Sequence, residues 1–243
     1  MFVLIDKKKK FRINQVSLTG GVILTEKEKQ NSNLKFMDGS YCLLFQKNNT
    51  FLFPKDKLED HLKENFKRID TIEISKKGLT ALSIEIKERT PFAVWCKGLP
   101  SSLDIEDCYF MDNNSTIFAK APNFSGDAYF KYYGDVSLGD PIGIEYMASS
   151  TKFAEISDFV KNVETLSIRP IYIIEREDDD FALVLSGGGQ VYFDTKESLY
   201  KTAQNLSALL RTDGLKNLDR ENLPVEYIDL RFGNKLFYKL KNQ

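Results

Sequence analysis

The chain has 243 residues and a mass of 27.9 kDa, which is room for one or two domains of ordinary size. Hydrophobic residues make up 42% and charged residues 28%, so we expect a globular protein with a substantial core and exclude a disordered one. Lys and Arg (34) balance Asp and Glu (35), and the net charge of −1 argues against nucleic acid as the main partner.

The sequence contains no membrane-length apolar segment. A membrane-spanning helix needs ~18 to 20 apolar residues, and the N-terminal apolar run Met1 to Ile5 stops at Asp6 and Lys7. Residues 1–10 are interpreted as a tail, because the parts of a secretory signal peptide are missing in their usual order. We therefore expect a soluble chain that is either cytoplasmic or targeted by a segment upstream of these residues.

Residues 11–88 read as the first of two domains. After Pro54, apolar residues recur every four positions, which predicts an amphipathic helix. The alternation of Leu82, Ile84 and Ile86 with polar residues predicts a strand. In chain order the expected elements are a strand at Phe11 to Leu18, a weak helix or loop at Thr25 to Ser40, a helix at Lys55 to Phe66, and strands at Thr71 to Ser75 and Ala81 to Lys87.

Residues 89–243 read as the second domain, with the boundary near Glu88 to Pro91. Short apolar runs separated by Gly, Pro, Asp or Asn predict a large, mostly antiparallel sheet, so the fold class is α+β. Two amphipathic helices, at Thr151 to Val163 and Lys196 to Arg211, are expected to cover it. The expected strands are Phe92 to Cys96, Cys108 to Met111, Thr116 to Ala119, Tyr129 to Tyr133, Ile142 to Tyr146, Ile171 to Glu175, Phe181 to Ser186, Val191 to Phe193, Val225 to Phe232 and Lys235 to Leu240.

No motif predicts catalysis, a cofactor or a metal. The single histidine, His61, has no second ligand or nucleophile motif near it, which favours a structural role. Gly187 to Gly189 lacks the Lys-Ser/Thr of a phosphate-binding loop and precedes a strand, which favours a hairpin turn. The acidic run Glu175 to Asp180 lacks the glycine and the distal glutamate of a calcium loop, which favours a solvated hairpin tip.

Cys96 and Cys108 flank a short connection between two expected strands. If those strands pair, the two Cα atoms fall within the ~5.5 Å that is typical of a disulfide. In an oxidising compartment a disulfide and a pair of reduced, buried thiols remain open alternatives. Cys42 is left over as a small hydrophobic residue.

Read in order, these segments resemble the FtsQ/DivIB family of bacterial cell-division proteins over nearly the whole chain, from Phe11 to Leu240. Glu88, Arg89 and Pro91 match the Glu-Arg-x-Pro junction between the two domains of that family. The ending YIDLRF, residues 227–232, resembles the terminal Val-Asp-Leu-Arg-Tyr strand. CYFMDNNSTIF, residues 108–118, resembles an aromatic-x-Asp-x-x-Gly-x-x-Phe hairpin, with Ser115 where Gly is usual.

The resemblance implies a POTRA module of order β-α-α-β-β at 11–88, followed by a β-domain at 89–243. It implies a non-enzymatic scaffold of the division complex at the septum, without cofactor, that binds FtsB/FtsL-type coiled-coil partners. Family members are single-pass membrane proteins, so this region is expected to be extracytoplasmic, with its anchor absent from the given residues. That compartment favours the disulfide between Cys96 and Cys108.

The C-terminal strand supplies a physical means of binding. If Lys235 to Leu240 lies at a sheet edge, its unpaired N–H and C=O groups accept an added strand from a partner. Lys239 and Lys241 then discourage unspecific pairing and attract an acidic segment. The other interpretation is that the hairpin only closes the sheet. The expected contact residues are Arg231, Phe232, Leu236, Phe237 and Tyr238.

Two other functions are compatible with the sequence. A POTRA-containing accessory module of a transport or secretion system requires repeated POTRA units or a downstream barrel, which the sequence does not show. A hydrolase that uses acidic residues such as Asp112 and Asp229 requires these carboxylates to converge in a cleft.

Overall fold

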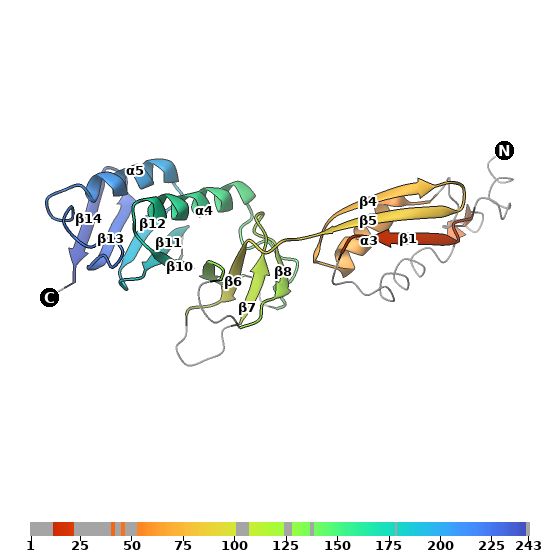
Figure 1. The fold of residues 1–243 in the computed structure, drawn as a ribbon, viewed down its shortest axis with the longest axis horizontal. Coiled ribbons are helices and arrows are strands. Elements are labelled where there is room, and N and C mark those ends of the chain that lie inside the picture. The colour runs from red at the N-terminus through yellow and green to blue at the C-terminus, as the bar shows by residue number, and fades with distance from the viewer. Residues whose placement is uncertain are drawn as a thin grey trace. The chain divides into compact units, whose positions relative to one another are not determined.

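The computed structural model describes residues 12–21, 40–41, 45–46, 53–100, 107–123, 128–136, 139–177 and 179–241, with the backbone alone at 40–41 and 45–46 (Figure 1). The chain forms two compact units, Met1–Thr90 and Pro91–Gln243. Both contain helix and strand, so the fold class is α+β.

The N-terminal unit is built on a mixed three-stranded sheet in the order β1-β5-β4, with β1 parallel to β5 and β4 antiparallel to it. A short antiparallel pair, β2 and β3, stands apart from this sheet. The weak helix or loop expected at Thr25 to Ser40 lies almost wholly outside the described residues. The elements are β1 (Gln15–Thr19), β2 (Ser40–Tyr41), β3 (Phe45–Gln46), α3 (Lys55–Asn65), β4 (Ile69–Lys77) and β5 (Ala81–Glu88).

The core of this unit is formed by apolar residues that recur every four positions in the helix and every two positions in the strands. Leu58 and Leu62 lie one turn apart on α3 and are buried. They join the buried face of the sheet, to which β4 contributes Ile72 and Ile74 and β5 contributes every second residue from Leu82. The helix predicted from four-residue spacing and the strands predicted from alternation are therefore both confirmed.

The C-terminal unit contains a nine-stranded sheet in the order β14-β13-β12-β11-β10-β9-β6-β7-β8. Five neighbouring pairs are antiparallel and three are parallel, so the sheet is mixed. Its strands are β6 (Ala93–Lys97), β7 (Cys108–Met111), β8 (Ile117–Lys120), β9 (Lys131–Gly134), β10 (Pro170–Glu175), β11 (Asp180–Leu185), β12 (Gln190–Asp194), β13 (Val225–Phe232) and β14 (Lys235–Leu240).

Two of the parallel pairs arise from helical crossovers, as parallel neighbours require. Helix α4 (Ser150–Thr165) connects β9 to β10, and α5 (Leu199–Leu209) connects β12 to β13. The strand expected at Ile142 to Tyr146 is wrong. Its residues form a turn closed by a hydrogen bond from the Ile144 amide to the Pro141 carbonyl, and a single bridge joins Thr116 to Glu145. Pro141, and Gly143 at φ 93°, break the extended backbone there.

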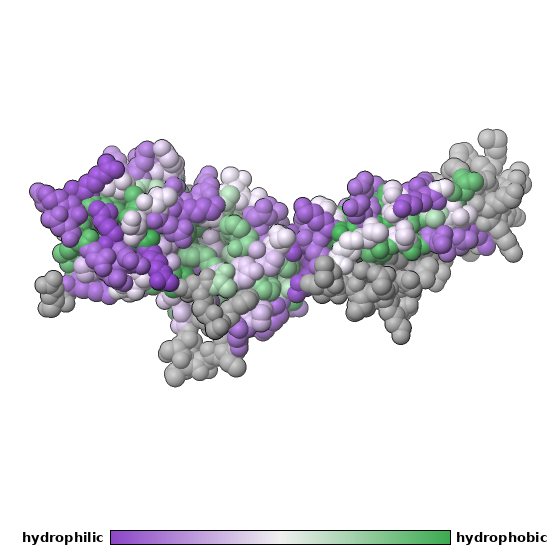
Figure 2. All heavy atoms as spheres, in the orientation of Figure 1, coloured by the Kyte–Doolittle hydropathy of each residue, from purple (hydrophilic) through white to green (hydrophobic). Residues whose placement is uncertain are grey.

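Both helices cover the same face of the sheet (Figure 1). Ser149 caps the N-terminus of α4, because its hydroxyl accepts a hydrogen bond from the Lys152 amide. Its buried stripe includes Phe153, Phe159 and Val163, and α5 adds a second stripe through Leu206. Figure 2 shows hydrophobic residues as small areas among hydrophilic ones on the face that it draws.

The other face of the sheet carries a smaller apolar cluster around a disulfide. Cys96 on β6 lies directly opposite Cys108 on β7, and their sulfur atoms are 2.03 Å apart. Val94, Ala121 and Tyr133 surround the bond, which is buried. Of the two forms that the sequence leaves open for these cysteines, the structure has the disulfide.

No helix among the described residues is long and apolar enough to span a membrane.

Candidate functional site at the C-terminal sheet edge

Strand β14 forms one end of the nine-stranded sheet, and among the described residues its one partner strand is β13. The two strands are joined by the turn at Gly233 and Asn234, in which Gly233 has φ 62°. An edge strand directs the N–H and C=O groups of every second residue away from its neighbour, which leaves them free for another strand. The edge position expected for Lys235 to Leu240 is confirmed.

Large apolar side chains remain accessible along this edge. Phe232, Phe237 and Tyr238 are 55%, 49% and 38% exposed, and Leu236 is partly buried against the core. The rings of Phe232 and Phe237 meet edge to face, with centroids 5.5 Å apart. Tyr238 lies opposite the buried Ile228, so it points to the helix-covered side of the sheet, while its neighbour Phe237 points to the other side.

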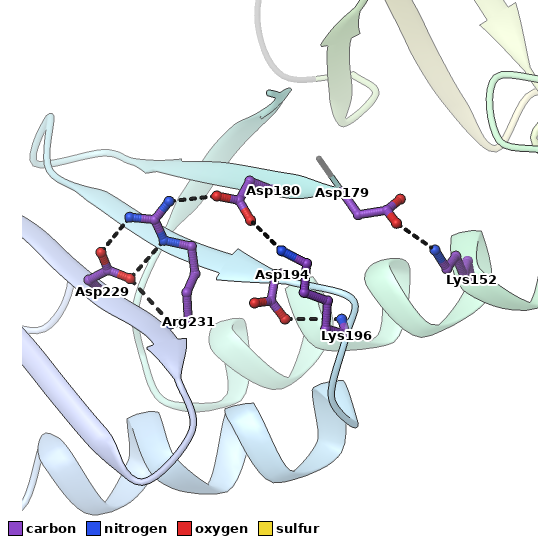
Figure 3. Close-up of polar contacts among 7 residues, drawn as sticks. All are labelled: Lys152, Asp179, Asp180, Asp194, Lys196, Asp229 and Arg231. Carbon is purple, nitrogen blue, oxygen red and sulfur yellow. Dashed lines mark hydrogen bonds and ion pairs between the residues drawn. The ribbon is translucent and has the colours of Figure 1, made fainter. Parts of the chain in front are cut away.

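Arg231 is bound within the sheet by two carboxylates (Figure 3). Its Nη2 and Nε atoms donate to Asp229 at 2.6 and 2.9 Å, and Nη1 donates to Asp180 Oδ2 at 2.6 Å. The hydrogen bond with Asp229 is the main reason that the pKa of Arg231 is raised above its usual value. The side chain keeps 28% of its surface exposed, and its guanidinium lies over the Tyr192 ring, 5.3 Å from the centroid.

The ion network extends along neighbouring elements (Figure 3). Lys196 Nζ lies 4.0 Å from Asp180 Oδ1, and Lys152 on α4 pairs with Asp179 at 3.1 Å. Asp180 and Arg231 are 51 positions apart, so no local sequence pattern predicts their contact. The two-residue spacing of Asp229 and Arg231 does place both side chains on one face of a strand, and is a signal that the sequence carries.

The two terminal lysines also have partners within the chain. Lys239 Nζ lies 2.6 Å from Glu226 Oε2, a contact that raises the pKa of Lys239. Lys241 Nζ donates to the Gly187 carbonyl at 2.5 Å. Because exposed ion pairs are worth little, the contact with Glu226 does not prevent Lys239 from meeting another carboxylate.

Asp112 and Asp229 do not converge in a cleft. Five strands separate β7 from β13 in the sheet, which is about 29 Å at the usual strand spacing. Asp112 is buried and its Oδ1 atom accepts the amide N–H groups of Asn114 and Thr116, both at 2.9 Å. Asp112 accepts hydrogen bonds from its own turn, and Asp229 accepts hydrogen bonds from Arg231. The two carboxylates therefore do not form the pair that the hydrolase hypothesis requires.

The remaining motifs take ordinary structural places. His61 lies on α3 with the Asn65 amide 3.3 Å from its Nδ1. Gly187 to Gly189 form the turn between β11 and β12, as predicted. Glu177 and Asp179 lie in the connection between β10 and β11, where the Asp180 amide donates to the Glu177 carbonyl at 3.2 Å. No group of three or more potential metal ligands occurs in the part of the chain that the structure describes.

Comparison of the sequence with protein-family models gave no match, and comparison with curated proteins gave none either. Function is therefore inferred from the sequence resemblance and from the contacts of the chain itself.

Proposed function

We propose that this chain is a non-enzymatic scaffold of the bacterial division complex, of the FtsQ/DivIB type. It binds the FtsB/FtsL-type coiled-coil partner by strand addition to β14. The observation that carries the proposal is an edge strand, paired on one side only, that exposes Phe237 and Tyr238.

Strand addition explains how one short edge provides both affinity and specificity. Backbone hydrogen bonds to β14 give affinity to any extended segment, and side chains on alternate positions select among segments. Phe232 and Phe237 offer an aromatic contact on one side of the added strand, and Tyr238 offers one on the other. Arg231 keeps the β13 end of this surface in place through Asp229 and Asp180.

We further propose that the N-terminal unit is the POTRA module. In chain order β1, α3, β4 and β5 would be the first strand, the second helix and the last two strands of the module, whereas β2 and β3 have no counterpart in the expected β-α-α-β-β order. The first helix of the module would fall on residues that the structure does not describe. The proposed location is the outer face of the cytoplasmic membrane, held by a single-pass anchor outside the given residues. The disulfide between Cys96 and Cys108 supports this location, because such bonds persist in oxidising compartments.

The test is a binding titration of this chain with the extracytoplasmic part of the coiled-coil division partner from the same genome. We expect the double variant Phe237→Ala with Tyr238→Ala to bind at least about tenfold more weakly, because large aromatic side chains dominate interface energies. Tyr200→Ala is the matched control, since Tyr200 is an exposed aromatic on α5 rather than on the edge. Circular dichroism checks that each variant is folded.

Hydrogen exchange separates strand addition from other modes of binding. Partner binding should slow exchange of the outward-facing amides of β14, because they gain hydrogen bonds. Absence of binding at high micromolar concentrations, with both proteins folded, would reject the proposed function. Binding without protection of β14 would place the partner elsewhere on the chain.

A further inference from the structure

Tyr238 on the edge strand rests against Gly214, in the segment that follows α5. A Cβ atom built on Gly214 would overlap the Tyr238 hydroxyl and would lie 3.4 Å from Tyr238 Cζ. The hydroxyl end of the Tyr238 side chain thus occupies the space that a Cβ atom at position 214 would need. Gly214 and Tyr238 are 24 positions apart, and only the tertiary structure brings them together.

The backbone does not require glycine at this position. Gly214 is not among the glycines with positive φ, so alanine can adopt its backbone conformation. The absence of a side chain at Gly214 matters instead because the Tyr238 side chain lies beside it. Gly214 therefore acts by leaving space for Tyr238.

Of the two contacting groups, the tyrosine is the one that can move. The segment around Gly214 is fixed by hydrogen bonds from the Leu215 and Lys216 amides to the Thr212 carbonyl, at 3.1 and 2.9 Å. Leu215 is fully buried in the main core. Tyr238 lies on an edge strand and is 38% exposed, so its ring can rotate outward with little loss of packing. A side chain at 214 would therefore displace the ring and leave the segment in place.

We infer that Gly214 is a positioning residue for the docking edge: by leaving space for the Tyr238 ring, it fixes the shape that β14 presents to an added strand. This inference rests on the proposed function. Two further contacts fix the ends of the same strand pair, because Asn205 Nδ2 on α5 donates to the Gly233 carbonyl at 3.1 Å and the Lys241 amide donates to the Pro224 carbonyl at 2.9 Å. Gly214 instead lies against the Tyr238 side chain in the middle of this strand.

The first arm of the test needs no partner. Tetranitromethane nitrates exposed tyrosines, and mass spectrometry reads the modification at Tyr238. We expect Tyr238 to react faster in Gly214→Ala than in the wild-type chain, with an unchanged circular dichroism spectrum. Asp213→Ala is the control, because Asp213 is exposed and its carboxylate pairs with Lys216 at 2.5 Å. An unchanged nitration rate in Gly214→Ala would overturn the inference whether or not the partner binds.

The second arm is a double-mutant cycle with the coiled-coil partner. Gly214→Ala should weaken binding by about tenfold, as Tyr238→Ala does, and should add no more than about twofold in the Tyr238→Ala background. Equal effects of Gly214→Ala in both backgrounds would show that it acts without Tyr238 and would overturn the inference. Failure of the wild-type chain to bind rejects the proposed function instead, and leaves the nitration result to decide the role of Gly214.

Discussion

Ser115 adopts a left-handed backbone conformation, with φ 66°, in the turn between β7 and β8. Residues other than glycine rarely adopt this left-handed conformation, because their Cβ atom clashes with the backbone. The resemblance to the FtsQ/DivIB hairpin also leads one to expect glycine at this position. Two contacts offset the cost. The fully buried Ser115 hydroxyl donates to the Met147 carbonyl at 3.0 Å, and Asp112 accepts two amides of the same turn. The turn therefore keeps its shape without the glycine.

Glu175, the last residue of β10, has a partly buried carboxylate. It lies against Gly134, where a Cβ atom would come within 2.8 Å of Glu175 Oε2. Burial raises the pKa of Glu175 above its ordinary value of 4.5, and the nearby Asp179 and Asp135 raise it further, while Tyr146 opposes the shift. Because the folded-state pKa is raised, the contribution of Glu175 to stability is greatest below pH 4.5 and is lost as the pH rises through the folded-state value.

We predict that Glu175→Gln raises the thermal midpoint at pH 7 by a few degrees and leaves it unchanged near pH 4. The amide resembles the protonated acid and carries no charge, so the penalty of ionisation disappears. The measurement is thermal unfolding of both proteins across this pH range. Glu177→Gln, an exposed carboxylate on the same turn, should shift the midpoint little at either pH. A lower midpoint for Glu175→Gln at pH 7 would contradict the prediction.

At the scale of elements, the disulfide joins the end of β6 to the start of β7, across the connection between these two strands. Cys96 and Cys108 are 12 positions apart, and the bond closes this loop beside β6 and β7. In the sheet β6 lies between β9 and β7, and β7 lies between β6 and β8, which is the last strand on that side. The cross-link between these two strands stabilises the fold mainly by restricting the unfolded chain.

We predict that Cys96→Ala with Cys108→Ala lowers the free energy of unfolding by about 2 to 4 kcal/mol, as expected for a loop of this length. Urea unfolding of the wild-type chain, with and without prior reduction, gives the comparison. The chain has three cysteines, so two in the disulfide leave one free thiol (3 − 2 = 1), Cys42, in the denatured, unreduced protein. A thiol titration that finds three would show that the bond does not form.

At the scale of the whole molecule, each unit has a core of its own. The N-terminal core contains residues from Ile13 to Ile86, and the main C-terminal core contains residues from Ala93 to Leu230. No residue belongs to both among those that the structure describes. Since a domain is stabilised by its own buried surface, this division predicts two separately folding parts.

We predict that Pro91–Gln243 alone folds cooperatively and keeps the near-ultraviolet circular dichroism of its buried Trp95. Removal of residues 224–243 from the same fragment is the informative comparison. It deletes β13 and β14, takes Val225, Ile228 and Leu230 out of the core, and exposes the edge of β12. The shorter fragment should lose most of its stability, and equal stability of the two would contradict a core that runs through β13.

The sequence by itself determined the local elements, because helix and strand leave different periods in the positions of apolar residues. Val225 to Phe232 and Lys235 to Leu240 were predicted with the bounds that the structure has, and Leu58 and Leu62 were placed on the buried face of α3. The strand predicted at Ile142 to Tyr146 failed, because its apolar residues are interrupted by Gly143 in a conformation that a strand does not tolerate.

Only the tertiary structure decided which distant residues meet. The order of the nine strands depends on where α4 and α5 cross over the sheet and on the return of β9 to the side of β6 after β7 and β8, and no local period records a crossover. The contact of Arg231 with Asp180 and the space that Gly214 leaves for Tyr238 depend on that order as well. Periodicity shows which side of an element is buried, whereas the partner of each side chain depends on how the elements pack.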